Sequence, residues 1–534
     1  MTSKSKINSK KQSNSYDEVV YETYPYSQTH PSHLYTIGKL FGVTKCNSVS
    51  KSRILELGCA CGDNIIPIAY HYPNSEVVGV DLSEEQIKIA NKKKEDLQIK
   101  NIKFHHCSIT DVDNSFGKFD YIIAHGIISW VDENVREKMF DILKNLLKEN
   151  GIGYISYNCL PGWNMVRSIR DMMLYHSKFF DNVSDKIFQA RALLNFVKEG
   201  ISDAKSPYSE VIAQEANMLA NSRDSYLMHD HLEKENFQYY FYEFMEKAEK
   251  YDLQYLADTS VSSMYLGNMP EKIRNKLGSV GNIVRTEQYM DFVNNRRFRS
   301  TLLCNKNIKL SRTIKPESFK DFSLLLSLLP EKPLDKVNLE NATESIKFYL
   351  NNNKNTHISS SSPIMKAILY SFSENINYPL TPDQIIKLSN KKLKENRSNE
   401  IKLELFHNLG RMLFSGNLDI IADPLINFTN KVSIKPKASR LARYQILYYN
   451  QFWVTNNLHR IVNIDFLERY LLQFTDGKNS KQDLVDKMIS AINEGKIKLN
   501  QDSKVLKLED MKNISEKAVN KVLQNFALNA LLIE

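Results

Sequence analysis

Cysteine is scarce in this sequence, and the six residues present show no disulfide or metal-binding pattern. They are Cys46, Cys59, Cys61, Cys107, Cys159 and Cys304. No CxxC pair and no zinc-like spacing occurs, so we predict free thiols in a reducing compartment and no metal site. The neighbouring His105 and His106 do not change this prediction, because adjacent residues on a strand point to opposite faces.

Long hydrophobic runs are missing as well. No stretch of about 18 or more uncharged apolar residues occurs, which argues against a membrane-spanning helix. The first 15 residues, MTSKSKINSKKQSNS, are polar and lack the apolar segment of a secretory signal. We therefore predict a cytoplasmic protein with a disordered basic tail over residues 1–15.

Concentrated positive charge is also absent. The 71 Lys and Arg exceed the 62 Asp and Glu, for a net charge of +9, but they are scattered along 534 residues. The densest run, NKKKEDLQIK at 91–100, includes acids and is more typical of a solvated helix face than of a phosphate-binding surface. We predict no nucleic-acid partner.

Short apolar runs alternate with amphipathic helical patterns between residues 52 and 158. The predicted strands are 53–58, 75–81, 102–107, 119–126 and 152–158, and the predicted helices are 64–72, 83–94 and 133–150. This alternation predicts an α/β, Rossmann-like domain with a parallel, doubly wound sheet. Ser83 and Gln86 have the spacing of a capping box, and Gly151 is expected to end the third helix.

The rest of the chain has mainly helical patterns. Residues 160–300 lose the strand rhythm, and the polar stretch NNNKNTHISSSS at 351–362 is typical of a loop. Residues 465–492 predict a helix, a turn and a second helix.

The first predicted crossover contains the turn ELGCACGDN at 56–64. A dinucleotide-binding turn would carry GxGxxG, but Ala60 replaces the second glycine and the flanking acids would repel a pyrophosphate. S-adenosylmethionine has no phosphate, and its cationic sulfur and amino-acid zwitterion are compatible with nearby carboxylates. We expect Gly58 and Gly62 to be required because a Cβ would push this ligand off the turn.

Two further acids follow the next strands. Asp81 ends the second strand, where it can accept hydrogen bonds from both ribose hydroxyls, and Asp111 follows the third, where it can accept from the adenine amino group beside Ile109. Because parallel strands bind ligands at their carboxyl edge, we predict an S-adenosylmethionine site there. The predicted cofactor-binding residues are Glu56, Gly58, Cys59, Ala60, Gly62, Asn64, Asp81, Leu82, Ser83, Gln86, Ile109, Thr110, Asp111, His125 and Gly126.

Segments outside the cofactor turn narrow the family. They include YDEVVYETYPYSQTHPSHLYTIGKLFG, SYNCLPGW, NFQYYFYEFMEKAEKYDLQYLAD, NRRFRSTLLC and the C-terminal LARYQ, VTNNLHR and ERYLLQFTDG. Over nearly its whole length the chain resembles the rickettsial protein lysine methyltransferases that modify outer membrane protein B, which are class I enzymes with a methyltransferase regulatory domain. Cys59 and Cys61 depart from the usual glycine turn, but they are small enough to leave cofactor binding intact.

This resemblance implies a methyltransferase domain followed by largely helical domains. The implied division is 16–165 for the S-adenosylmethionine-binding domain, 166–305 for a helical regulatory and dimerisation domain, 306–436 for a middle helical domain and 437–534 for a winged-helix-like domain. It also implies a homodimer that transfers methyl groups to lysine ε-amines of an outer membrane protein, unfolded or extended before export.

Lysine methylation requires alignment of a neutral amine with the methyl carbon, and aromatic walls suit both the stem and a methylammonium product. The predicted catalytic residues are Tyr24, Tyr26, His125, Asn158 and Trp163, and the predicted substrate-binding residues are Tyr239, Tyr240 and Tyr242. Pro25 keeps Tyr24 and Tyr26 on an extended segment. The three substrate-binding candidates also fit a buried helix face. The sequence assigns no general base.

Two other functions stay open. One is an RNA or small-molecule methyltransferase, although HGIISW at 125–130 lacks the Asn- or Asp-Pro-Pro-aromatic motif of many such enzymes. The other is a DNA-binding regulator that uses PLTPDQIIKLS at 379–389 and TDGKNSKQDLVDKM at 475–488. Both segments place acids where base and phosphate contacts need Lys or Arg, which favours a packing or substrate-docking role.

Overall fold

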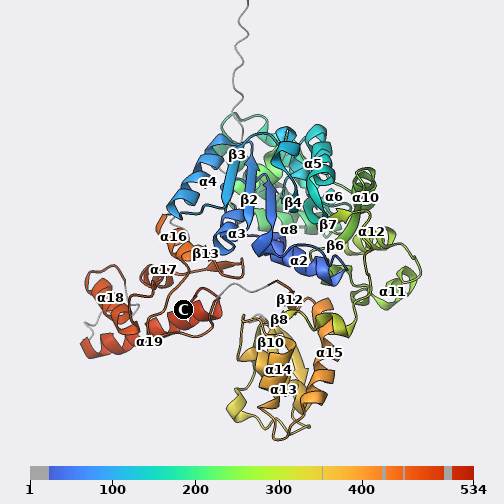
Figure 1. Cartoon of the computed structure of the whole chain (residues 1–534). Coiled ribbons are helices and arrows are strands. Elements are labelled where there is room, and N and C mark those ends of the chain that lie inside the picture. The colour runs from blue at the N-terminus through green and yellow to red at the C-terminus, as the bar shows by residue number, and fades with distance from the viewer. Residues whose placement is uncertain (1–22, 351–352, 424–427, 449–451, 498–507) are drawn as a thin grey trace, which may run out of the picture.

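The computed structural model describes residues 23–350, 353–423, 428–448, 452–497 and 508–534 (Figure 1). The predicted disordered tail at 1–15 lies outside the described residues. Within these ranges, no helix combines the length and hydrophobicity needed to cross a membrane.

Five parallel strands form the centre of the main sheet, as predicted. They are β1 (Arg53–Leu57), β2 (Glu76–Asp81), β3 (Ile102–His106), β4 (Phe119–Ala124) and β5 (Leu147–Asn158). The strand order is β3-β2-β1-β4-β5-β7-β6. The order therefore reverses at β1, and the carboxyl end of that strand is where open α/β sheets bind ligands.

Two antiparallel strands complete this sheet and were not predicted. β7 (Phe298–Asn305) pairs with β5, and β6 (Leu253–Asp258) pairs with β7. The expectations of an all-parallel sheet and of a helical 160–300 segment are wrong for these strands. Both strands are almost fully buried, so their sequences show no alternation that separates a strand from a buried helix.

Helices cover both faces of the sheet. One face packs against α2 (Pro31–Leu40), α3 (Ile65–His71) and α4 (Glu84–Asp96), and the other against α5 (Glu133–Leu146) and α10 (Phe241–Lys250).

The third predicted helix is shorter than expected, because α5 ends at Leu146 and β5 begins at once. The predicted helix-ending role of Gly151 is wrong. This residue lies inside β5, where a Cβ would approach the Asp120 carbonyl oxygen at 3.1 Å. The strand needs a glycine here because the backbone of the adjacent strand β4 is close.

A helical layer follows β5 and has its own apolar core. It consists of α6 (Trp163–Ser177), α7 (Val183–Gly200), α8 (Pro207–Ala220), α9 (Asp224–Leu227) and a π-helical turn at Met228–Leu232. Two further helices, α11 (Glu271–Leu277) and α12 (Ile283–Asn294), lie between β6 and β7.

Residues 306–436 contain strands as well as the predicted helices. The strands are β8 (Ser323–Leu325), β9 (Leu328–Pro330), β10 (Ile346–Leu350), β11 (Asn353–Ser360) and β12 (Asp419–Ile421), and the helices are α13 (Pro363–Ser373), α14 (Pro382–Asn390) and α15 (Ser398–Phe414). The loop predicted at 351–362 is wrong over β11. This strand lies at a sheet edge with mostly exposed side chains, so it can be polar.

The C-terminal part contains a short hairpin and four helices. They are α16 (Arg440–Tyr448), β13 (Trp453–Thr455), β14 (Ile461–Asn463), α17 (Phe466–Leu472), α18 (Lys481–Asn493) and α19 (Leu508–Leu528). The predicted helix–turn–helix is confirmed as α17 and α18. Figure 1 shows α16 and β13 next to the main sheet, and the Tyr444 hydroxyl donates to the Asp96 carboxylate at the end of α4 (3.0 Å).

Candidate active site

The turn after β1 has an unusual backbone. Gly58, Ala60 and Gly62 have positive φ values of 70°, 46° and 76°. A Cβ on Gly58 would lie 2.2 Å from Ile127, and one on Gly62 would lie 2.9 Å from Phe104. Protein contacts and backbone conformation therefore favour glycine at both positions, and the predicted displacement of a ligand stays a prediction. 

Cys59 does not face the ligand edge with its side chain. It is buried, and its sulfur lies 2.7 Å from the position that a Cβ on Gly79 of β2 would take. The prediction of a cofactor contact is corrected for this thiol, which packs between the turn and the neighbouring strand.

Glu56 lies at the end of β1 beneath the turn and is only 4% exposed. One carboxylate oxygen, Oε1, accepts a hydrogen bond from Asn64 Nδ2 at 2.7 Å, while Oε2 is buried without a partner among the described residues. Burial raises the pKa of Glu56 to about 8. A buried acceptor without a donor suits the ammonium group of S-adenosylmethionine, so the residues present fit this cofactor.

Asp81, at the end of β2, holds the turn in place. Its two carboxylate oxygens accept from the backbone N–H of Ala60 at 2.8 Å and of Ser83 at 2.9 Å. Asp81 also lies at the carboxyl edge of the sheet, where its carboxylate is a candidate acceptor for a ribose hydroxyl. This anchoring role was not predicted, and it makes Asp81 both a candidate ligand contact and a structural residue.

The start of α4 lies beside Asp81 but forms only half of the predicted capping box. The Ser83 hydroxyl accepts from Gln86 N at 3.3 Å, whereas Gln86 Oε1 is buried with no partner among the described residues. Leu82 precedes this cap with an exposed side chain, which is available to a ligand at the edge.

The predicted adenine contacts lie in the turn Ile109–Asp111, directly after β3. Asp111 Oδ2 accepts from Ser108 N at 3.1 Å, and Thr110 N donates to the Ser108 hydroxyl at 3.2 Å. The turn is therefore capped internally, with Asp111 still exposed to solvent and Ile109 half-buried. Because β3 pairs with β2, this turn and Asp81 lie at the same edge of the sheet.

His125 and Gly126 follow β4. His125 Nδ1 lies 2.8 Å from the Tyr154 hydroxyl and 3.1 Å from Ser156 Oγ, and its ring packs on Tyr26 with centroids 4.1 Å apart. Burial lowers the pKa of His125 to about 4, so the ring is neutral near pH 7. In the part of the chain that the structure describes, no atom lies within 4 Å of the position of a Cβ on Gly126, so the described residues leave space beside the sheet here.

The segment with Tyr24 and Tyr26 packs against this edge. Tyr26 N donates to Asn64 Oδ1 at 2.9 Å, next to the cofactor turn. Tyr24 packs on Trp453 of the C-terminal part, with ring centroids 5.2 Å apart, and its hydroxyl accepts from Arg223. The structure thus brings Tyr26 together with His125 and places Tyr24 at a junction of three segments.

Asn158 and Trp163 lie at the end of β5 and just beyond it, and both are buried. Asn158 Nδ2 has no partner among the described residues, so it is available as a donor. Trp163 Nε1 donates to Asn236 Oδ1 at 3.0 Å, and its ring lies edge-on to Trp130. These contacts give Trp163 a packing role in this arrangement.

The three predicted substrate tyrosines do not form one surface. Tyr239 is 1% exposed and packs edge-on against Tyr157 and Phe244, so its predicted substrate contact is wrong and it is a core residue. Tyr240 and Tyr242 stack on each other with centroids 5.8 Å apart, and Tyr242 is exposed.

Asp230 was not predicted from the sequence. It lies on the π-helical turn Met228–Leu232, a feature often found at functional sites. Burial raises the pKa of Asp230 to about 7, and burial followed by the charge of Asp230 raises the pKa of Tyr26. The charge of Asp230 thus acts on Tyr26, which makes Asp230 a candidate for a role at this edge. No spacing rule predicts it, because the π turn forms only when the helical layer packs.

Comparisons with known proteins agree with this geometry. Family models match the chain as a methyltransferase domain at 48–249, a predicted methyltransferase regulatory domain at 223–305 and a PKMT C-terminal winged helix domain at 435–531. The uncharacterized protein RP789 of Rickettsia prowazekii is 49% identical over 521 residues, which cover 97% of this chain and 94% of that protein.

A solved structure is similar over almost the same length. It is that of PKMT2 from Rickettsia typhi in complex with AdoHcy, with a TM-score of 0.89 and 39% identity over 96% of this chain and 100% of that one. This chain belongs to the protein lysine methyltransferase family. The methyltransferase uses S-adenosylmethionine as its cofactor, and the predicted class I fold with a C-terminal winged-helix domain is confirmed.

Membership in this family decides between the functions that the sequence left open. The enzyme is a protein lysine methyltransferase. The segment TDGKNSKQDLVDKM, considered above for DNA binding, lies within the PKMT winged helix domain, and PLTPDQIIKLS contributes α14. Neither the RNA or small-molecule methyltransferase nor the DNA-binding regulator is retained.

Proposed function

We propose that this enzyme methylates lysine ε-amines of a bacterial outer membrane protein, which it binds in the cytoplasm in an unfolded or extended form. The observation that best supports methyl transfer at this edge is the buried, unpartnered Oε2 of Glu56 beneath the turn. Family membership supports lysine as the acceptor, and the resemblance to enzymes that modify outer membrane protein B supports the substrate.

The residues at the edge suit the separate parts of the cofactor. Glu56 would accept from the ammonium group, Asp81 from the ribose hydroxyls and Asp111 from the adenine amino group, with Ile109 against the ring. When bound, S-adenosylmethionine supplies an electrophilic methyl group on a cationic sulfur. The open space at Gly126 leaves room at the end of β4 for the reacting groups.

The substrate lysine must lose a proton before its nitrogen can attack. We place this amine beside Tyr26 and the neutral His125, whose packed rings exclude water. The charge of Asp230 acts on Tyr26, and with a pKa of about 7 its carboxylate can attract the ammonium group and hold the proton that it releases. Asp230 is thus our candidate general base.

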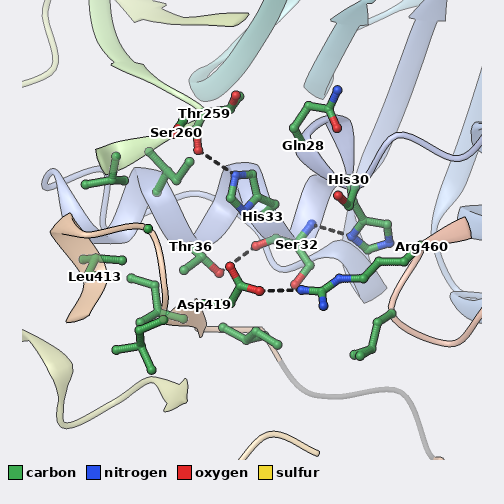
Figure 2. Close-up of a pocket in the computed structure, with 18 of the residues that line it drawn as sticks. Gln28, His30, Ser32, His33, Thr36, Thr259, Ser260, Leu413, Asp419 and Arg460 are labelled. Atoms are coloured by element: carbon green, nitrogen blue, oxygen red, sulfur yellow. Dashed lines mark hydrogen bonds and ion pairs between the residues drawn. The ribbon is translucent and has the colours of Figure 1, made fainter. Parts of the chain in front are cut away.

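An interdomain cavity gives an extended polypeptide a route to this edge. The cavity of about 340 Å³ lies between α2, the segment after β6, the middle part and the C-terminal hairpin. Figure 2 shows Gln28, His33, Thr259, Asp419 and Arg460 around it. Hydroxyl, amide and ion-pair groups of this kind suit peptide backbone, and Gln28 is two residues from Tyr26.

The helical layer supports a homodimer. Four aromatic side chains on α6, on α7 and in the turn between them are 63–72% exposed, namely Tyr175, Phe179, Phe188 and Phe196. Large exposed apolar side chains gathered on packed helices are typical of protein interfaces. We propose that a second copy of the chain covers these side chains.

We also propose that the chain is divided into domains at 16–165, 166–305, 306–436 and 437–534, as the resemblance implies.

Transfer of labelled methyl groups tests the substrate. The full-length enzyme is incubated with labelled S-adenosylmethionine and outer-membrane protein fragments, unfolded or folded, and in parallel with nucleic acid and a metabolite extract. We expect label on lysines of the unfolded fragments, located by mass mapping, and little label with the Asp81→Ala variant. Label found only in nucleic acid or metabolites would contradict the substrate.

A further inference from the structure

One residue of the C-terminal part reaches the cofactor turn. His459 lies in the turn between β13 and β14, is 3% exposed and has a left-handed backbone conformation with φ +56°. Its Nε2 lies 3.0 Å from Oδ1 of Asn64, the residue just before α3. Its ring also packs on His30, with centroids 4.8 Å apart. A hairpin far along the chain is therefore buried against the cofactor site.

The orientation of the Asn64 amide determines which atom donates this hydrogen bond. Tyr26 N donates to Asn64 Oδ1, which also lies 3.2 Å from Thr29 Oγ1, and Asn64 Nδ2 donates to Glu56 Oε1 and to Thr29 Oγ1. The amide oxygen therefore faces His459. An amide oxygen only accepts, and His459 Nε2 must therefore carry the proton. Burial, followed by the neighbouring His30 and His71, holds the pKa of His459 well below its usual range, so the ring is a neutral donor.

Asn64 in turn stabilises the charged form of Glu56. Burial and the nearby Asp81 and Asp63 raise the pKa of Glu56, and the hydrogen bond from Asn64 lowers it. A carboxylate must be ionised to pair well with an ammonium group. The fixed position of Asn64 thus controls how readily Glu56 can receive the amino-acid end of the cofactor.

We propose that His459 is a positioning residue of the cofactor site, through which the C-terminal domain holds Asn64 against Glu56. This inference rests on the proposed cofactor role of Glu56 and extends it to the C-terminal domain. It gives the winged-helix domain a part in cofactor binding. Because coupling is reciprocal, a bound cofactor also stabilises the docked hairpin.

The test compares variants at one backbone position in the full-length enzyme by calorimetric titration with AdoHcy. Asparagine tolerates the left-handed conformation but is too short to replace Nε2, whereas glutamine can place an N–H near that position. We expect His459→Asn to weaken AdoHcy binding about tenfold, as for one lost buried hydrogen bond, and His459→Gln to restore most of the affinity.

Arg460 offers a matched control on the same hairpin. Its guanidinium pairs with Asp419 across the interdomain cavity (Figure 2). Arg460→Ala removes a neighbouring, partly exposed ion pair of the hairpin and leaves the donor to Asn64 in place. We expect the AdoHcy affinity of this variant to stay within about twofold of wild type, since exposed ion pairs contribute little.

The pH dependence of AdoHcy binding distinguishes two roles of His459: positioning Asn64 against Glu56, or only stabilising the fold. Without the His459 hydrogen bond, Asn64 orients less well and the pKa of Glu56 rises further, so the rise in affinity with pH shifts to higher pH. The amine of AdoHcy titrates equally with both proteins, and the difference between variants isolates Glu56. A merely structural role would lower the melting temperature but leave this profile in place.

The possible results are distinguishable. The inference would be overturned if His459→Asn bound AdoHcy as tightly as Arg460→Ala does. It would also be overturned if His459→Asn and His459→Gln lost the same affinity and the pH profile did not shift. If Glu56→Gln weakens AdoHcy binding in the same series, the proposed cofactor site still stands. If Glu56→Gln binds AdoHcy as wild type does, the proposed site itself is wrong.

Discussion

At the scale of single residues, Glu56 links the chemistry of the site to the stability of the fold. Its folded-state pKa of about 8 lies far above the unfolded value of about 4.3, so the folded protein binds an extra proton between them. The stability contributed by the protonated group is present below about pH 4 and is lost as the pH rises through about 8.

The variant Glu56→Gln removes this titration. We expect its free energy of unfolding to fall less than that of wild type between about pH 4 and about pH 8, with a difference of roughly 1–3 kcal/mol. Denaturant unfolding of both proteins across this range measures the effect. Parallel curves would show that Glu56 is not buried as an acid.

Asp81 has two roles that substitutions can separate. Asp81→Ala removes the acceptors for ribose and for the backbone of the turn, and we expect AdoHcy binding to weaken by about 1–3 kcal/mol. Asp81→Asn keeps one acceptor oxygen and should lose less. Calorimetry measures both affinities, with circular dichroism as the control for folding, and an unchanged dissociation constant in Asp81→Ala would remove this residue from the site.

At the scale of elements, the sequence predicted the helices and strands that have a clear local pattern of apolar and polar residues, and it missed the others. The β–α alternation and the strand-ending Asp81 and Asp111 located the ligand edge. β6 and β7 were missed because fully buried strands lack alternation, and Asp230 was missed because no periodicity predicts a π turn. Tyr239 was misassigned because the sequence pattern does not show which way a side chain faces.

The π-helical turn Met228–Leu232 also gives a prediction at this scale. It carries Asp230, whose charge acts on Tyr26, and Asp230→Asn keeps the shape but cannot hold a proton. We expect kcat/KM for lysine methylation to fall about 100-fold or more, with loss of the pH dependence near 7 and no change in AdoHcy affinity. Steady-state rates against pH measure this. A profile that keeps the same inflection in the variant would assign the proton to another group.

At the scale of the whole molecule, the segments quoted from the sequence predicted the family, but not how its parts meet. Asn64 is the clearest case, because its contacts come from Glu56 in β1, from Tyr26 and Thr29 in the N-terminal segment and from His459 in the C-terminal hairpin. Residues 395 positions apart in the chain are paired there. No sequence pattern predicts such a pairing, since it depends on how separately folded parts dock.

The exposed aromatic side chains of α6 and α7 make the last prediction. Phe188→Ser and Phe196→Ser together remove two large apolar groups from the proposed dimer surface without opening the core, because both side chains already face solvent in one copy. We expect sedimentation velocity to show wild type as a dimer and the double variant as mainly monomer, since hydrophobic side chains dominate such interfaces. The control Leu403→Ser changes a comparably exposed side chain on α15 and should leave the dimer intact. If the double variant still sediments as a dimer, a different face joins the two copies, and the aromatic residues of α6 and α7 are left for another partner.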